Sequence, residues 1–148
     1  RSTQYLSDAD AQAIAVYLRA LPQRAIAPAE VVKPSAATLE RGAKVYEQHC
    51  AQCHGDNGEG KPGAFPALAG NRAVVLQDPT NLVRVVLQGG YLPATAGNPR
   101  PHGMPPFMQV LGDDDVAAVS TFVRNAWGNQ APAVGTIGVY RARERRGS

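Results

Sequence analysis

The chain has 148 residues, 44% of them hydrophobic and 18% charged, and its formal net charge is +3. This composition excludes a disordered chain, and no run of 18 apolar residues is present to span a membrane. Aromatic residues make up only 6%, against 15 glycines and 12 prolines, so we expect a small, loop-rich domain that needs another source of apolar contact.

The first predicted helix begins after Ser7, a suitable N-cap that is followed by aspartates at the positive end of the helix dipole. Apolar residues recur at helical spacing as far as Leu21, and Pro22 ends the pattern. Residues 22–34 contain three prolines and are expected to form a linker.

Three more helices are predicted, over about 35–49, 79–89 and 113–128, each with apolar residues on one face. The segments 55–72 and 91–106 between them are rich in glycine and proline and are predicted to be loops. No alternating strand pattern of any length is present in the sequence. The expected fold class is therefore all-α, with long loops.

One internal repeat suggests how the chain is organised. The segment Leu6–Arg19 aligns with Leu111–Arg124 at a constant offset of 105 residues. A repeat separated by the length of a domain indicates tandem domains, although two capped amphipathic helices can also look alike by chance. We therefore divide the chain into the last helix of a preceding domain with its linker (1–33), one domain (34–130) and a basic C-terminal tail (131–148).

The positive charge is concentrated in that tail. Residues 131–148 contain four arginines and one glutamate, whereas residues 34–130 contain seven bases against eight acids. A basic tail can bind a membrane surface or an acidic protein, and the plainer alternative is a solvated terminus with no partner. No basic face interleaved with aromatic residues occurs elsewhere, so nucleic-acid binding is not expected.

The chemistry is indicated by a C-x-x-C-H motif, in which Cys50, Cys53 and His54 are the defining residues. This motif is the signature of covalent c-type haem attachment. Two thiols three positions apart on a helical turn can bond to the vinyl groups of one porphyrin, and the adjacent imidazole then points at the iron. The expected cofactor is one covalent haem c, which also supplies the apolar bulk that the sequence lacks.

Three other interpretations of the cysteine pair fit the sequence less well. A redox-active dithiol needs a βαβ setting, and no strands are predicted. A zinc site lacks a second pair of ligands at finger spacing. A disulfide closing so short a loop on a helix would be strained.

A second axial ligand for the iron is expected downstream. Met104 lies in a proline-rich loop just before the last predicted helix, and a stiff loop can hold a weak thioether ligand. Met108 and His102 are the alternatives, together with an open sixth position. Ligation by His54 and Met104 would stabilise ferrous iron and raise the reduction potential.

With these motifs in place, residues 35–129 resemble a class I cytochrome c domain. Gly42-x-x-x-Tyr46-x-x-x-Cys50 is similar to the first helix of that family, and Met104-Pro105-x-Phe107 is similar to its ligand loop. The resemblance implies that Gly42 permits close crossing by the last helix, with Val119 and Phe122 as the crossing residues.

The segment Pro66-Ala67-Leu68-Ala69-Gly70 resembles a Pro-x-Leu-x-Gly segment of the same family. The resemblance implies that the Pro66 carbonyl accepts a hydrogen bond from the His54 imidazole and that Leu68 packs on the haem. An acceptor of this kind would fix the tautomer of the ligand and tune the iron.

A more specific resemblance is to the C-terminal haem domain of multi-haem cytochrome subunits of bacterial membrane-bound dehydrogenases, of the alcohol and gluconate type. Residues 122–129 are similar to the run that ends the last helix there, but this chain has one C-x-x-C-H motif rather than three. The resemblance implies a periplasmic location and association with a membrane through a complex. It implies as partners the upstream haem domains and a dehydrogenase subunit, or a soluble redox carrier.

The expected function is one-electron transfer through a haem ligated by His54 and Met104, in a domain that is not itself an enzyme. One alternative is a sensor or peroxidase-like domain with an open haem position. Another is a docking domain in which the haem mainly stabilises the fold.

Overall fold

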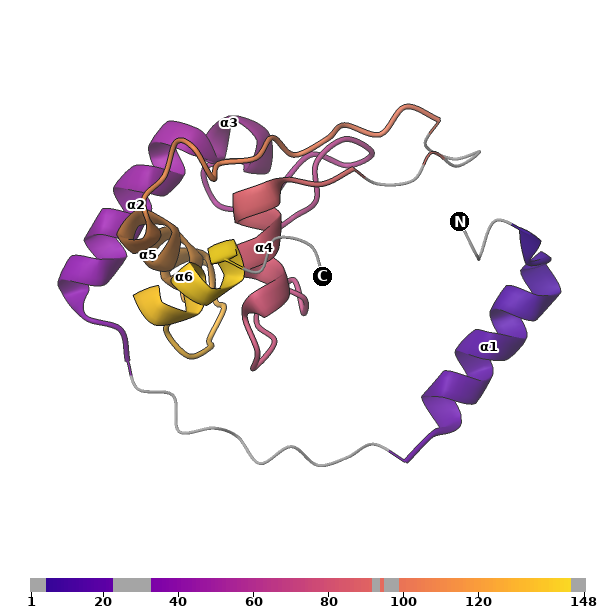
Figure 1. The fold of residues 1–148 in the computed structure, drawn as a ribbon. Coiled ribbons are helices and arrows are strands. Elements are labelled where there is room, and N and C mark those ends of the chain that lie inside the picture. Colours follow the sequence, from indigo (N-terminus) through magenta and orange to yellow (C-terminus); the bar gives the residue numbers. More distant parts are fainter. Residues whose placement is uncertain (1–4, 23–32, 92–93, 95–98, 145–148) are drawn as a thin grey trace.

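The computed structural model describes residues 5–22, 33–91, 94 and 99–144 (Figure 1). Its helices are α1 (Asp8–Ala20), α2 (Ala36–His49), α3 (Ala51–His54), α4 (Thr80–Gln88), α5 (Asp113–Val123) and α6 (Thr136–Glu144). Over the described ranges no strand accompanies them, and only two isolated bridges occur. The all-α prediction is therefore confirmed. No helix in these ranges is long and apolar enough to cross a lipid bilayer.

The centre of the fold is the crossing of α2 and α5 (Figure 1). α2 begins after Ser35, whose hydroxyl accepts a hydrogen bond from the Thr38 amide, as expected of an N-cap. A Cβ atom at Gly42 would overlap the carbonyl oxygen of Ala118 and lie 2.6 Å from the Cβ atom of Phe122. The absence of a side chain at Gly42 thus lets the two backbones approach. Val119, also expected at the crossing, is buried in the core.

α5 ends earlier than the sequence predicted, at Val123 rather than near residue 128. Trp127 has a φ of +53° and leaves the helical path. Its ring packs 4.9 Å from that of Tyr46 and 5.4 Å from that of Phe122, measured between centroids. Packing of this ring against α2 and α5 therefore accompanies the break in the helix.

The basic segment 131–148 contains a helix that the sequence pattern did not indicate. α6 packs against α4 and α5, and it buries Val139 and Ala142. Completely or almost completely buried side chains from the three helices, among them Leu87, Val116 and Val139, meet in the core. The part of the tail that the structure describes is thus an element of the domain, and residues 145–148 lie outside the described ranges.

α1 has the predicted capping: the hydroxyl of Ser7 accepts from the Asp10 amide, and the Asp10 carboxylate accepts from Ser7. None of its residues is buried, and it makes no packing contact with the other described helices. Ile14, Tyr17 and Leu18 are exposed, so its apolar face has no partner among them.

Candidate haem site

One helical turn gathers the two thiols and the imidazole. Cys50 ends α2, and α3 is the single turn Ala51–His54 that follows. The Cys50 carbonyl oxygen accepts hydrogen bonds from the amides of Cys53 at 3.1 Å and His54 at 3.0 Å. The C-x-x-C-H motif therefore has the local helical geometry that attachment to one porphyrin requires.

The imidazole of His54 is oriented by a backbone carbonyl. Its Nδ1 atom lies 2.9 Å from the carbonyl oxygen of Pro66, the pair that the family resemblance implied. Because a carbonyl can only accept, Nδ1 carries the proton and Nε2 keeps its lone pair for a metal.

The loop that contains Pro66 is fastened from two sides. The carbonyl oxygen of Gly58 accepts from the amides of Leu68 and Ala69, at 2.7 and 2.9 Å. On the other side, the amide group of Asn129 donates to the Leu68 carbonyl at 3.0 Å and accepts from the Gly70 amide at 3.0 Å. The buried Asn129, which follows α5 in the chain, thus links this part of the fold to the loop that orients His54. No local sequence pattern indicates this contact, which joins residues about sixty positions apart.

The Met104 segment is held against the end of α4. Gly90 and Met104 exchange two backbone hydrogen bonds, of 3.1 and 2.8 Å. Two more join the amides of Phe107 and Met108 to the last turns of α4, at 3.1 and 3.0 Å. Gly89 has a φ of +70°, and a Cβ atom there would overlap the Met104 carbonyl oxygen. A glycine at that position is required for the segment to lie so close.

A cavity of about 360 Å³ lies between these elements. Five of the six predicted site residues line it: Cys50, Cys53, His54, Pro66 and Met104. The rest of its wall is largely apolar and aromatic, with contributions from Phe65, Val85, Tyr91 and Phe107. Two thiols, an imidazole nitrogen and a thioether around an apolar space are the groups that a covalently attached haem needs.

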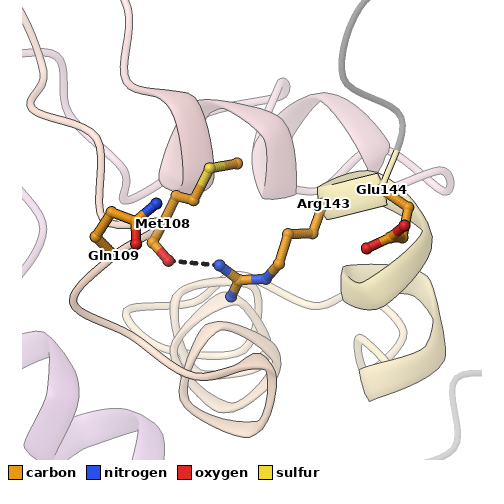
Figure 2. Close-up of a pocket in the computed structure, with 4 residues that line it drawn as sticks. All are labelled: Met108, Gln109, Arg143 and Glu144. Carbon is orange, nitrogen blue, oxygen red and sulfur yellow. Dashed lines mark hydrogen bonds between the residues drawn. The ribbon is translucent and has the colours of Figure 1, made fainter.

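Not every predicted residue lies at the cavity. Leu68 is outside its lining and packs against the core, where its backbone anchors the Pro66 loop. Met108 lines a separate hollow with Gln109, Arg143 and Glu144 (Figure 2). His102 does line the haem cavity, and its ring centroid lies 5.0 Å from that of Phe65. Of the alternatives to Met104, only His102 is therefore at the cavity.

His49, which directly precedes Cys50, was not identified as a site residue from the sequence. It is partly buried, lines the cavity and meets the ring of Phe107 edge-on, with 6.0 Å between centroids. Whether a residue next to this motif faces the cavity or the solvent depends on tertiary packing. For His49 the contact with Phe107 from the Met104 segment turns the ring toward the cavity.

The dithiol interpretation does not fit the electrostatics of the pair. Burial, and then the neighbouring Cys53, raise the pKa of the Cys50 thiol to about 11. A reactive dithiol needs the opposite shift, because the thiolate is the nucleophile. Before haem attachment, Cys50 is therefore a protonated, partly buried thiol at neutral pH, and the described part of the chain contains no strands of a thioredoxin-like fold.

The cytochrome c family model matches residues 39–127. The chain is 40% identical over 147 residues to the cytochrome c subunit of alcohol dehydrogenase (quinone) from Gluconacetobacter polyoxogenes, covering 92% of this chain and 31% of the relative. It is 35% identical over 144 residues to the gluconate 2-dehydrogenase cytochrome c subunit of Pantoea cypripedii, covering 91% and 33%. Cytochrome c-552 of Thermus thermophilus is 38% identical over 91 residues, covering 60% and 69%.

The chain spans about a third of the length of these dehydrogenase subunits. The span matched by the family model contains both thiols, the imidazole, Pro66 and Met104. This agrees with the prediction of one covalent haem c at the single C-x-x-C-H motif, and with the resemblance on which it rested. By its sequence, its fold and the motif at its cavity, the chain belongs to the cytochrome c family.

Proposed function

We propose that this chain transfers single electrons through one covalent haem c, with His54 and Met104 as its axial ligands. The observation that carries the proposal is that both thiols, His54 and Met104 line one apolar cavity. When bound, the haem supplies the ferric–ferrous couple. Ligation by imidazole and thioether favours the ferrous state and raises the potential.

The residues of this chain hold the two ligands in place. The Pro66 carbonyl keeps the His54 imidazole in one tautomer and orientation. The two hydrogen bonds with Gly90 hold the Met104 backbone. Apolar and aromatic side chains form most of the remaining wall of the cavity, where they would contact the porphyrin. The domain therefore serves electron transfer rather than catalysis of its own.

Replacing Met104 with alanine tests this ligation. We expect the oxidised holoprotein to lose the weak sulfur–iron band at the red end of its spectrum, and the reduced form to bind carbon monoxide. The potential should fall by a sizeable part of the ~0.8 V range over which axial ligands set haem potentials.

Met108→Leu is the matched control, because Met108 lines a different hollow, and it should keep the band. A band that persists in Met104→Ala would remove Met104 from the site. A wild-type protein that lacks the band and binds carbon monoxide would favour a sensor or peroxidase-like domain.

We further propose that residues 1–33 are the last helix of a preceding haem domain with its linker, and that residues 34–130, together with α6, form the terminal domain of a multi-haem dehydrogenase subunit. The repeat supports this interpretation, because equivalent positions differ in burial. Ile14 is 45% exposed and its equivalent Val119 only 3%. Arg19 is exposed, whereas its equivalent Arg124 is fully buried. α1 thus has the pattern of α5 without the packing.

Deleting residues 1–33 tests whether α1 belongs to this domain. We expect the thermal midpoint of the haem-loaded protein to move by less than ~2 °C, because α1 makes no packing contact with the other described helices and so contributes little stability. The measurement is the melting curve of the haem absorbance, with the full chain as reference. A loss of several degrees would mean that α1 packs on this domain and is not a remnant of another.

In such a subunit the electron donor would be an upstream haem domain or the dehydrogenase subunit, and a soluble carrier could accept the electron. The relatives' names, as cytochrome c subunits of alcohol and gluconate dehydrogenases, support a dehydrogenase partner. The proposed periplasmic location rests on the resemblance to the haem domains of such subunits. A contact of the C-terminal segment with a membrane surface or an acidic protein would use the exposed face of α6, where Ile137 and Tyr140 lie.

A further inference from the structure

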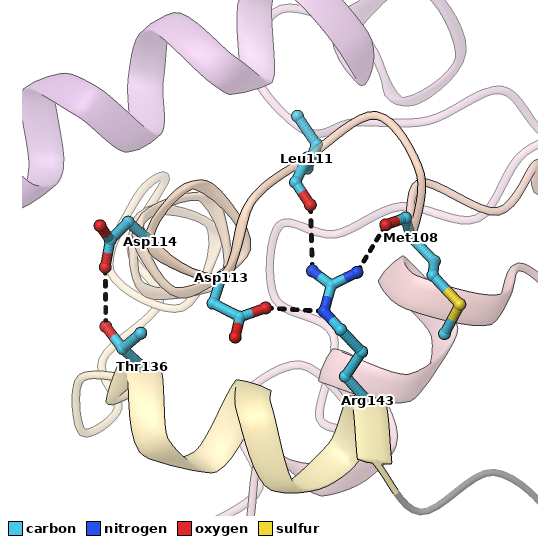
Figure 3. A network of polar contacts seen from close by, with 6 residues as sticks. All are labelled: Met108, Leu111, Asp113, Asp114, Thr136 and Arg143. Carbon is cyan, nitrogen blue, oxygen red and sulfur yellow. Dashed lines mark hydrogen bonds and ion pairs between the residues drawn. The ribbon is translucent and has the colours of Figure 1, made fainter.

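Arg143 in α6 reaches the segment that joins Met104 to α5 (Figure 3). Its Nε atom donates to the Asp113 carboxylate at 2.7 Å, Nη1 donates to the Met108 carbonyl, and Nη2 donates to the Leu111 carbonyl at 3.0 Å. All three acceptors lie between the ligand loop and the first turn of α5. We propose that Arg143 is a positioning residue that holds this segment and thereby keeps Met104 at the haem.

The contact is more enclosed than the other ion pairs of the described residues. The side chains of Arg143 and Asp113 are 23% and 25% exposed, whereas Arg41, Lys44 and Glu40 are exposed by half or more in their pairs. Guanidinium has a planar fork of donors, so one side chain satisfies a carboxylate and two carbonyls at once.

The helix that carries Arg143, α6, is itself held in place by packing and by a hydrogen bond at its start. The buried Val139 and Ala142 anchor the helix against α4 and α5. At its start, the Thr136 hydroxyl donates to the Asp114 carboxylate at 3.1 Å. The helix is therefore tied to the first turn of α5 at two points, through Thr136 and through Arg143 (Figure 3).

The contact with Arg143 restrains Met104 through a short stretch of backbone that is hydrogen-bonded on both sides. The Met108 amide donates to the Leu87 carbonyl at 3.0 Å, while the Met108 carbonyl accepts from Arg143. The same peptide segment is thus fastened to α4 on one side and to α6 on the other. Only three residues separate Met108 from Met104, which is held independently at Gly90.

Without Arg143, two carbonyls lose their donor and Asp113 keeps its charge beside Asp114 and Asp115. Both effects favour opening of residues 105–111. A thioether is a weak ligand, so an open segment would release the Met104 sulfur more often. This inference rests on the proposed ligation by Met104.

The test compares Arg143→Gln with Arg141→Gln in the holoprotein. Arg141 lies on the same helix, is exposed and gives the same charge change. We expect Arg143→Gln to speed amide hydrogen exchange of residues 107–111, and carbon monoxide binding to the reduced protein, by about tenfold or more. Exchange in α2, and in α5 beyond its first turn, should stay unchanged, which separates local opening from general destabilisation. Arg141→Gln should stay within about twofold of wild type in every measurement.

Equal rates in the two variants would overturn the positioning role. Should the glutamine variant fail to fold, Arg143→Lys decides instead, because lysine keeps a charge for Asp113 without the fork that reaches both carbonyls. We then expect an intermediate rise in both rates, and wild-type rates would overturn the role. Rapid carbon monoxide binding by the wild-type protein would overturn Met104 ligation, and the positioning role with it, so the two failures are distinguishable.

Discussion

Replacing Gly42 with alanine is expected to lower the free energy of unfolding of the holoprotein by about 2 kcal/mol or more, although alanine is the better helix former. In an open helix the change would stabilise by ~0.5–1 kcal/mol. Here the new methyl group would overlap the Ala118 carbonyl oxygen and lie 2.6 Å from the Cβ atom of Phe122. Backbone cannot swing aside as a flexible side chain does, and overpacking costs ~1–3 kcal/mol or more. The clash therefore outweighs the helix propensity.

The matched control is Gly138→Ala in α6, where a Cβ atom would have nothing within 4 Å. That variant should gain about 0.5–1 kcal/mol. Thermal melting of both variants decides the matter, since ~1 kcal/mol moves the midpoint of a domain of this size by about 4 °C. If Gly42→Ala melts at or above the wild-type temperature, the close approach of α2 and α5 does not require a glycine at position 42.

Features of the fold that depend on residues close together in the chain could be predicted from the sequence. Ser7 and Ser35 cap helices by contacts three residues away, so their signals are local. The Ser7 cap was predicted, and the second helix was expected to begin near Ser35. The C-x-x-C-H motif is contiguous, so its helical geometry could be anticipated directly. Gly42 was identified only because its spacing from Tyr46 and Cys50 resembles that of a known family.

Contacts between distant residues were not accessible in this way. Asn129 meets the Pro66 loop some sixty residues away, and Arg143 meets Met108 and Asp113 across about thirty. α6 was missed because nine residues with two buried side chains have only a weak amphipathic pattern. Its arginines suggested a charged, solvated tail, whereas Arg143 is turned inward by acceptors that no local pattern reveals.

Arg124 makes another set of contacts between distant residues, and we expect a large effect on stability from its replacement because its side chain is fully buried. Its Nη1 atom donates to the carbonyls of Val74 at 2.7 Å and Leu76 at 2.8 Å, and its Nε atom donates to the Pro132 carbonyl at 3.0 Å. It thereby joins the segments that lead into α4 and α6. Burial lowers the pKa of its guanidinium, and the carboxylate of Asp78 partly offsets that effect.

We expect Arg124→Met to lower the free energy of unfolding of the holoprotein by about 2–4 kcal/mol. Methionine keeps an unbranched stem in the apolar packing, so the variant mainly removes the donors. Each buried carbonyl left without a donor costs ~1–3 kcal/mol, and the relief from burying a charge returns part of this sum. Urea denaturation followed by the haem absorbance measures the loss.

Arg72→Met is the control, because Arg72 is exposed and its loss should change stability by no more than about 0.5 kcal/mol. Equal midpoints for the two variants would contradict a structural role for Arg124. The two arginine contacts should also be separable, because Arg124→Met should destabilise the domain as a whole, so that amide exchange throughout α2 and α5 rises with that of residues 107–111. Arg143→Gln should affect residues 107–111 and the first turn of α5 only, because its acceptors are the carbonyls of Met108 and Leu111 and the carboxylate of Asp113.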